Sequence, residues 1–377
     1  MNEKNFLPSD QISQSQFFFF MIHSQVGLTI LGLPHLLGKT AGHDGWISVI
    51  LAGIYVQLLV LLYYFIIKKY PDSTLFDIIV DVFGAFAGKC LNILLVVYYI
   101  MYSIHFIYQC TSILKLWNYY RTPFWFMALL LIFVGYYILM GDLLTIGRFL
   151  TISIVIILTM LYFMFWDLNE LNYHHILPVG EAGIWNILKA SKDGFTAFAG
   201  FEIFLFIHPF VQSAKKNKAR LLKLANISIW FVCSLYLLTT VFVYLYFPNA
   251  AKNVVNAVIY FIVPMHFNVL ERIEVFFIAA WSLLMATSYI CFLFIGCLGL
   301  SKLNHKNHHN HYLLPVSILI FICAVIMNLF ATKEFFTVFN QIKSYYSYFV
   351  IVLVPMLTAL LLLFRKGKQK GMTANET

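Results

Sequence analysis

Repeated apolar runs dominate this chain, and they limit what it can fold into. Three clear examples cover residues 47–67, 91–114 and 124–140. A helix that crosses a bilayer takes roughly 20 apolar residues, and each of these runs approaches or exceeds that length. Of the 377 residues, 61% are hydrophobic and only 11% are charged, a balance that ordinary water-soluble domains do not show. The runs lack the alternation of barrel strands, so the sequence predicts an all-α integral membrane protein.

The apolar runs predict about ten transmembrane helices in a single transmembrane domain, residues 1–377. The expected spans are 16–37, 46–67, 90–114, 123–140, 146–166, 187–211, 224–247, 273–300, 312–331 and 344–364. The first five form one half (16–166) and the last five a second half (187–364), with short tails. Residues 71–89 place acidic and apolar residues at helical spacing, which predicts an amphipathic helix on the inner membrane surface. Residues 248–267 are apolar enough to fold down as a lid.

Lysine and arginine gather on one side of this predicted topology. The clearest groups are Lys215, Lys216, Lys218, Arg220 and Lys223 between spans 6 and 7, and Arg365, Lys366, Lys368 and Lys370 in the tail. The positive-inside rule then places both termini in the cytoplasm. The net charge of +9 follows from this asymmetry and favours contact with anionic lipid, and no exposed basic domain suggests nucleic-acid binding. The six cysteines lie in or beside apolar runs without a CxxC motif, which predicts packing residues and no disulfide framework.

Two of the predicted spans contain residues that interrupt a helix. Span 1 carries QVGLTILGLP, with Gly27, Gly32 and Pro34, and span 6 carries GFTAFAGFEIFLFIHP. Interruptions at matching positions of two halves are typical of inverted repeats whose broken helices form a binding site at the bilayer midplane. A half-helix N-terminus can hold a carboxylate, and unwound carbonyl groups near Ala199 and Gly200 can hold an ammonium group. The alternative is that these glycines only allow close helix packing.

Several of these motifs resemble a known family. VGLTILGLP and FAGFE are similar to the first-helix and sixth-helix signatures of amino acid–polyamine–organocation permeases. Together with AGHDGWISVILAG, GFEIFLFIHPF and ERIEVFFIAAW, they resemble the B subunit of GerA-type spore germinant receptors over nearly the whole chain. The resemblance implies a LeuT-like fold of two inverted five-helix repeats, with spans 1 and 6 broken. It also implies a nutrient-binding role and assembly with an A subunit and a lipoprotein C subunit in the spore inner membrane.

The broken helices and the resemblance together define the candidate site, since spans 3 and 8 flank the ligand in LeuT-like folds. The candidate ligand-binding residues are Gly27, Leu28, Thr29, Gly32, Tyr98, Tyr102, Phe198, Ala199, Gly200, Phe201, Glu202, Trp281 and Thr287. Many permeases carry a glycine where this chain has Thr29. Glu202 is expensive within a membrane, so it either acts in gating, proton binding or ligand binding, or it holds span 6 by a hydrogen bond. Thr287 and Ser288 resemble a hydroxyl pair that binds sodium in some relatives; no other metal site is predicted.

Three functions remain compatible with these patterns. The first is a sensor that binds a small nutrient, expected to be an amino acid, between spans 1, 3, 6 and 8 and passes the signal to its partner subunits. The second is an amino acid transporter coupled to protons or sodium, because a sensor can keep the whole transporter architecture. The third is a subunit that only scaffolds the complex. No catalytic or cofactor-binding motif is present, so we expect no enzyme activity and no cofactor.

Overall fold

The computed structural model contains helices and no named strand within the residues that it describes, which are 11–166, 171–212, 217–247, 253–265, 272–306, 308–330 and 332–364. Glu271, Lys215, Lys216, Lys252 and the basic tail lie outside these ranges. The helices are α1 (Gln14–Gln25), α2 (Leu33–Ala41), α3 (Gly45–Lys69), α4 (Leu75–Phe83), α5 (Ala85–Trp117), α6 (Phe124–Leu139), α7 (Leu143–Ile152), α8 (Ile154–Met164), α9 (Ile184–Ala197), α10 (Phe204–Ile207), α11 (Lys218–Tyr246), α12 (Ala257–Ile262), α13 (Ile273–Leu303), α14 (Asn310–Phe330), α15 (Lys333–Tyr348) and α16 (Val354–Phe364).

Seven helical stretches of the described residues are long and apolar enough to cross a membrane. They are Leu33–Lys69, Ala85–Trp117, Leu143–Met164, Lys218–Tyr246, Ile273–Leu303, Asn310–Phe330 and Glu334–Phe364. The remaining predicted spans are the shorter α6 and the two interrupted segments, α1 with α2 and α9 with α10. The all-helical membrane fold and the broken first and sixth spans are therefore confirmed, whereas the exact limits of the two halves remain a prediction.

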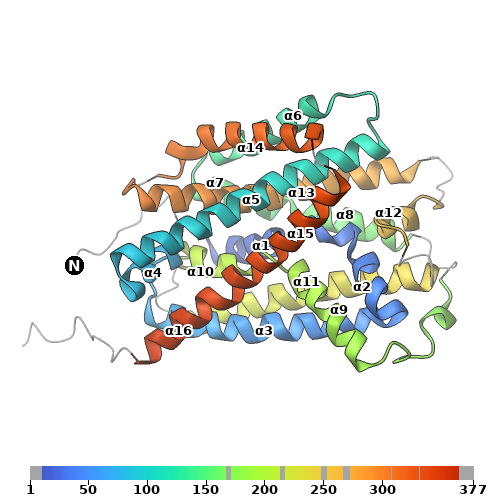
Figure 1. Ribbon diagram of the computed structural model, residues 1–377, viewed down its shortest axis with the longest axis horizontal. Coiled ribbons are helices and arrows are strands. Elements are labelled where there is room, and N and C mark those ends of the chain that lie inside the picture. Colours follow the sequence, from blue (N-terminus) through green and yellow to red (C-terminus); the bar gives the residue numbers. More distant parts are fainter. Residues whose placement is uncertain are drawn as a thin grey trace, which may run out of the picture.

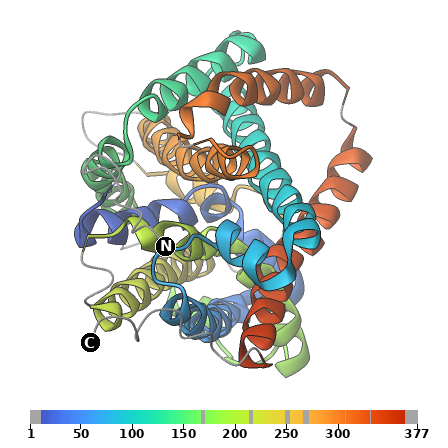
Figure 2. The same cartoon turned by 90° about the vertical axis from the view of Figure 1, so that its left-hand side faces the viewer.

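Helices at corresponding positions of the two predicted halves pack against each other. The second and seventh spans, α3 and α11, are in contact, as are the third and eighth, α5 and α13, and the fourth and ninth, α6 and α14. In addition, α1 of the first span meets the turn that begins at Phe201 in the sixth. Figure 1 shows the long helices running along the horizontal axis, and Figure 2 looks at the bundle from one end. This pairing is what two interlocked repeats produce.

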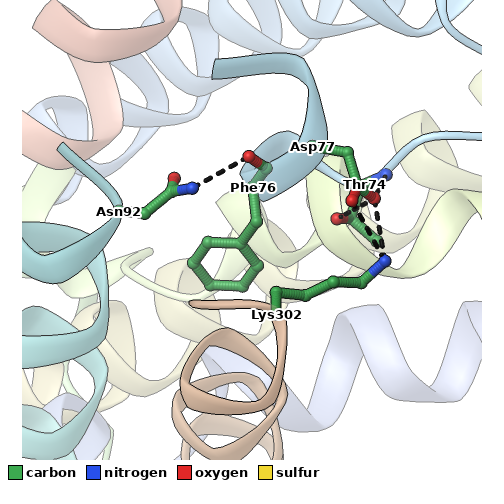
Figure 3. Close-up of polar contacts among 5 residues, drawn as sticks. All are labelled: Thr74, Phe76, Asp77, Asn92 and Lys302. Carbon is green, nitrogen blue, oxygen red and sulfur yellow. Dashed lines mark hydrogen bonds and ion pairs between the residues drawn. The ribbon is translucent and has the colours of Figure 1, made fainter. Parts of the chain in front are cut away.

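The predicted amphipathic segment forms α4, which packs on α5 and α13 (Figure 3). Thr74 and Asp77 form a capping box at its start, satisfying backbone N–H groups that a helix leaves unpaired there. The Asp77 carboxylate also lies 3.0 Å from Lys302 Nζ, near the end of α13. From α5, the Asn92 amide donates to the carbonyl of Phe76 at 2.9 Å. The helix α4 is thus held by one polar contact to α13 and another to α5, and the side chain of Phe76 is buried.

The AGHDGW motif connects α2 to α3 and binds the loop that contains Gly180 and Ala182. The Asp44 carboxylate is fully buried and accepts hydrogen bonds from the N–H groups of Gly180 and Ala182, both at 2.9 Å. Gly45 is required by packing, since a Cβ there would lie 2.4 Å from the Tyr244 hydroxyl. The motif therefore has a structural role that the sequence alone did not reveal.

The last span differs from the others in shape. The helix α15 crosses the front of the bundle diagonally in Figure 1 and continues into α16 through a π-helical turn, Phe349–Leu353. Its side chains contact two neighbours, because the Tyr346 hydroxyl donates to the Leu94 carbonyl of α5 and the Tyr348 hydroxyl to the Lys192 carbonyl of α9. Four residues after Ile351 stands Pro355, which has no N–H to donate to the Ile351 carbonyl. This carbonyl instead accepts a hydrogen bond from the Tyr63 hydroxyl at 2.6 Å.

Candidate functional site

The first span breaks at the glycines that predicted the break. The helix α1 ends at Gln25, and Val26 follows with extended backbone, φ −88° and ψ 104°. A short 3-10 turn, Thr29–Leu31, precedes α2, which has Pro34 in its first turn. Proline is tolerated at that point because the first N–H groups of a helix have no partner within it. Seven residues, 26–32, thus separate the two α-helical parts of the first span.

The second break meets the first at Gly200. The helix α9 ends at Ala197, and helical turns resume at Phe201 after Gly200, whose φ is +119°. A Cβ on Gly200 would lie 2.2 Å from the carbonyl oxygen of Ser24. The Ser24 hydroxyl, in turn, lies 3.0 Å from the Gly200 carbonyl oxygen. The two breaks therefore touch backbone to backbone, and only glycine fits between them.

Side chains from α11 and α13 satisfy carbonyl groups that the breaks expose. The Tyr236 hydroxyl lies 2.7 Å from the Gln25 carbonyl oxygen and 3.1 Å from that of Ala197, so one side chain bridges both breaks. The Trp281 indole N–H donates to the Gly27 carbonyl at 3.0 Å. Both aromatic side chains are fully buried. Exposed carbonyls are costly in a membrane, so these contacts stabilise the break.

Thr287 and Ser288 lie against the first break, where a sodium site was considered. The Ser288 hydroxyl is 2.7 Å from the His23 carbonyl oxygen and 3.0 Å from that of Val26. The Thr287 hydroxyl donates to the Leu284 carbonyl at 2.7 Å and lies 3.0 Å from His23 Nδ1. These oxygen ligands are all neutral, and each hydroxyl already has a carbonyl partner. The sodium site stays a prediction; within the described ranges, no group of three or more His, Cys, Asp or Glu side chains is placed to hold a metal ion.

Glu202 lies at the second break and faces span 3. Its side chain is 1% exposed. One carboxylate oxygen accepts from the Gly200 N–H at 2.7 Å, and the other accepts from the Tyr98 hydroxyl at 3.2 Å. Of the two roles considered for Glu202, this geometry matches the hydrogen bond that holds span 6 in place.

A cavity of about 340 Å³ opens beside the two breaks. Five predicted site residues line it: Leu28, Thr29, Gly32, Tyr102 and Ala199. Eight others do not: Gly27, Tyr98, Phe198, Gly200, Phe201, Glu202, Trp281 and Thr287. These eight residues are buried, and their part in ligand binding stays a prediction. Val255 and Asn256, which precede α12, line the cavity next to Gly32. The predicted lid stays a prediction, and its residues 248–252 and 266–267 lie outside the described residues.

The prediction missed several polar residues of the cavity wall. Gln25, His105, Asp193 and Lys343 all line it. The predicted tenth span began at residue 344, so Lys343 was assigned to the preceding loop. It is, however, the only charged residue between Glu334 and Arg365. A lone charge in a long apolar helix usually marks a functional position, and this signal was present in the sequence.

The fold defines the general class of the protein. Solved structures with the same arrangement include MhsT in complex with L-phenylalanine, at a TM-score of 0.62, 13% identity and coverage of 94% of this chain and 88% of that one. A Na⁺-coupled sialic acid symporter in a substrate-bound outward-open state also has a TM-score of 0.62, at 11% identity, covering 94% and 78%. At these identities the likeness establishes the fold alone, which is the LeuT fold of secondary transporters.

The sequence relationship is more specific. Residues 11–335 match the family described as "Spore germination protein", and the chain belongs to that family. Its relatives include spore germination protein GerQB of Bacillus cereus, 25% identical over 321 residues, which covers 84% of this chain and 87% of the relative. Spore germination protein B2 of Bacillus subtilis (strain 168) is 26% identical over 301 residues, covering 77% and 79%. The resemblance inferred from the motifs is thus confirmed.

Proposed function

We propose that this chain is the nutrient-sensing membrane subunit of a spore germinant receptor and binds an amino acid in the cavity beside the two breaks. The observation that carries the proposal is the position of the cavity, which lies where broken helices of a LeuT fold meet. Its volume is within the range of small-molecule sites. Among proteins of this fold, MhsT has been solved in complex with L-phenylalanine.

A sensor needs two conformations with different affinities for the ligand, because a ligand that binds both equally shifts nothing. Closing the lid segment before α12 over an occupied cavity would supply such a difference. We propose that an A subunit and a lipoprotein C subunit receive the signal. The chain would lie in the spore inner membrane with both termini in the cytoplasm, in contact with anionic lipid.

Membership in the spore germination family favours this role over an amino acid transporter coupled to protons or sodium. One feature of the site supports the same choice: Glu202 is held by Tyr98 and a backbone N–H. The family members and solved neighbours are germination proteins and transporters, in line with a role that involves no catalysis.

The experiment combines binding and uptake on the full chain in liposomes. Each of the proteinogenic amino acids is tested for saturable binding, and for accumulation under sodium and proton gradients. The variant Thr29→Phe replaces a small side chain of the cavity wall with an aromatic ring that occupies the cavity. Thr159→Phe, on α8 and away from the cavity, is the matched control. We expect binding without accumulation, lost only in Thr29→Phe. Accumulation driven by a gradient would instead establish a transporter, and binding unaffected by Thr29→Phe would place the site elsewhere.

A further inference from the structure

Lys343 brings a positive charge to the cavity wall opposite the breaks. It stands on α15, and its Nζ lies 2.7 Å from His105 Nε2 of α5 and 5.6 Å from the centre of the Tyr102 ring. Within the described ranges, no acidic side chain forms an ion pair with it. A charged group at membrane depth is costly and is normally paired.

The hydrogen bond between Lys343 and His105 has a defined direction. An ammonium group has only donors, so Lys343 donates and His105 Nε2 accepts. The ring hydrogen of His105 is then on Nδ1, which is buried and has no hydrogen-bond partner. His105 thus orients Lys343, whose remaining N–H groups have no acceptor among the described residues.

The opposite wall of the cavity contains Gln25 and the acidic Asp193. Gln25 is 3% exposed, and its side-chain NH₂ donates to the Met21 carbonyl, which leaves Oε1 buried without a partner. Asp193 of α9 lines the same cavity and adds a negative charge. One side of the cavity thus carries the acidic Asp193 and the other carries Lys343.

From this polarity we infer an anion subsite formed by Lys343 with His105, which binds the carboxylate group of a zwitterionic ligand. The ammonium group of the same ligand then lies toward Asp193. The carboxylate is held by a lysine of span 10, not by the N-terminus of a half-helix. This inference rests on the proposed function for the identity of the ligand, but the subsite itself can be tested without it.

The competing explanation is that Lys343 only holds α15 against α5. Benzoate separates the two explanations, since it offers a carboxylate and no ammonium group. The thermal unfolding of the full chain in lipid nanodiscs is measured with benzoate and with sodium chloride at equal ionic strength. The variants are Lys343→Met, Lys343→Arg, which keeps the charge, and Lys89→Met, the control on the exposed part of α5.

We expect benzoate to raise the Tm of the wild type and of Lys89→Met, to raise that of Lys343→Arg in part, and to leave Lys343→Met unchanged. An equal shift in all four proteins, or no shift in the wild type, overturns the subsite. If Lys343→Met does not elute as a single species, Lys343→Gln replaces it, because it removes the charge and keeps a hydrogen-bonding side chain.

A second measurement connects the subsite to the ligand. Each amino acid that binds the wild type is compared with its carboxamide, which lacks the negative charge. We expect Lys343→Met to weaken binding of the amino acid about tenfold or more and binding of the amide less than about twofold. Equal losses for both overturn the inference. If no amino acid binds the wild type, the proposed function fails, while the benzoate result still decides the subsite.

Discussion

The two walls of the cavity are built in opposite ways. The wall formed by the breaks is rigid: Gly200 has no room for a methyl group, and Tyr236 and Trp281 satisfy the exposed carbonyls from neighbouring helices. The wall formed by α15 is loosely packed, with Ser347 its only fully buried side chain among the described residues. Segments with few buried contacts open at low free energy. The comparison suggests that one wall fixes the position of the ligand and the other responds to it.

The π-helical turn gives the responsive wall a place to move. The hydroxyl of Tyr63 on α3 satisfies one carbonyl of this turn, that of Ile351. Such turns often stand at functional sites of helices. A ligand that pairs with Lys343 would pull on α15 just before this turn, so the change in the cavity would be transmitted along span 10.

The largest effect is expected at the point where the two breaks touch. Gly200→Ala combines an unfavourable φ with a clash against the Ser24 carbonyl, and we expect a loss of about 3 to 5 kcal/mol in the free energy of unfolding. Gly84→Ala is the matched control, since its φ is +88° but nothing lies within 4 Å of the added Cβ. It should lose only about 1 kcal/mol. Thermal unfolding in lipid measures both, and similar losses would show that the close contact contributes nothing.

A smaller effect is expected from the hydroxyl that bridges the breaks. Tyr236→Phe leaves the carbonyls of Gln25 and Ala197 without this donor, so the free energy of unfolding should fall by about 1 to 3 kcal/mol. Tyr99→Phe is the control, because the Tyr99 hydroxyl is buried without a partner and its removal should be neutral or stabilising. An effect of Tyr99→Phe as large as that of Tyr236→Phe would contradict the role given to the bridge.

A tyrosine-to-phenylalanine substitution on α15, Tyr346→Phe, should have the smallest effect on the free energy of unfolding. The Tyr346 hydroxyl donates to the Leu94 carbonyl at 2.5 Å, but the side chain is only half-buried. The Leu94 carbonyl lies inside α5, where backbone N–H groups pair with such carbonyls, so Tyr346→Phe should change the free energy of unfolding by less than about 0.5 kcal/mol. A loss equal to that of Tyr236→Phe in the same unfolding assay would remove the distinction between the two walls.

Much of the fold could be predicted because its signals are local. Apolar runs determine where spans lie, and Gly27, Gly32, Pro34 and Gly200 mark breaks within their own segments. The cavity wall depends instead on which helices meet. Glu202 faces Tyr98, 104 positions away, and Lys343 faces His105, 238 positions away. No spacing rule connects such pairs, so the sequence identified the broken helices and missed the charged residues opposite them.

The central claim is that an amino acid in this cavity triggers the response. The most direct test is germination of spores whose receptor carries the full chain as wild type, Thr29→Phe or Thr159→Phe, at equal protein levels. With each amino acid, germination is followed by the loss of optical density. The account predicts that Thr29→Phe spores no longer respond to the amino acid that germinates the wild type, while Thr159→Phe spores still do. A normal response in Thr29→Phe spores would contradict it.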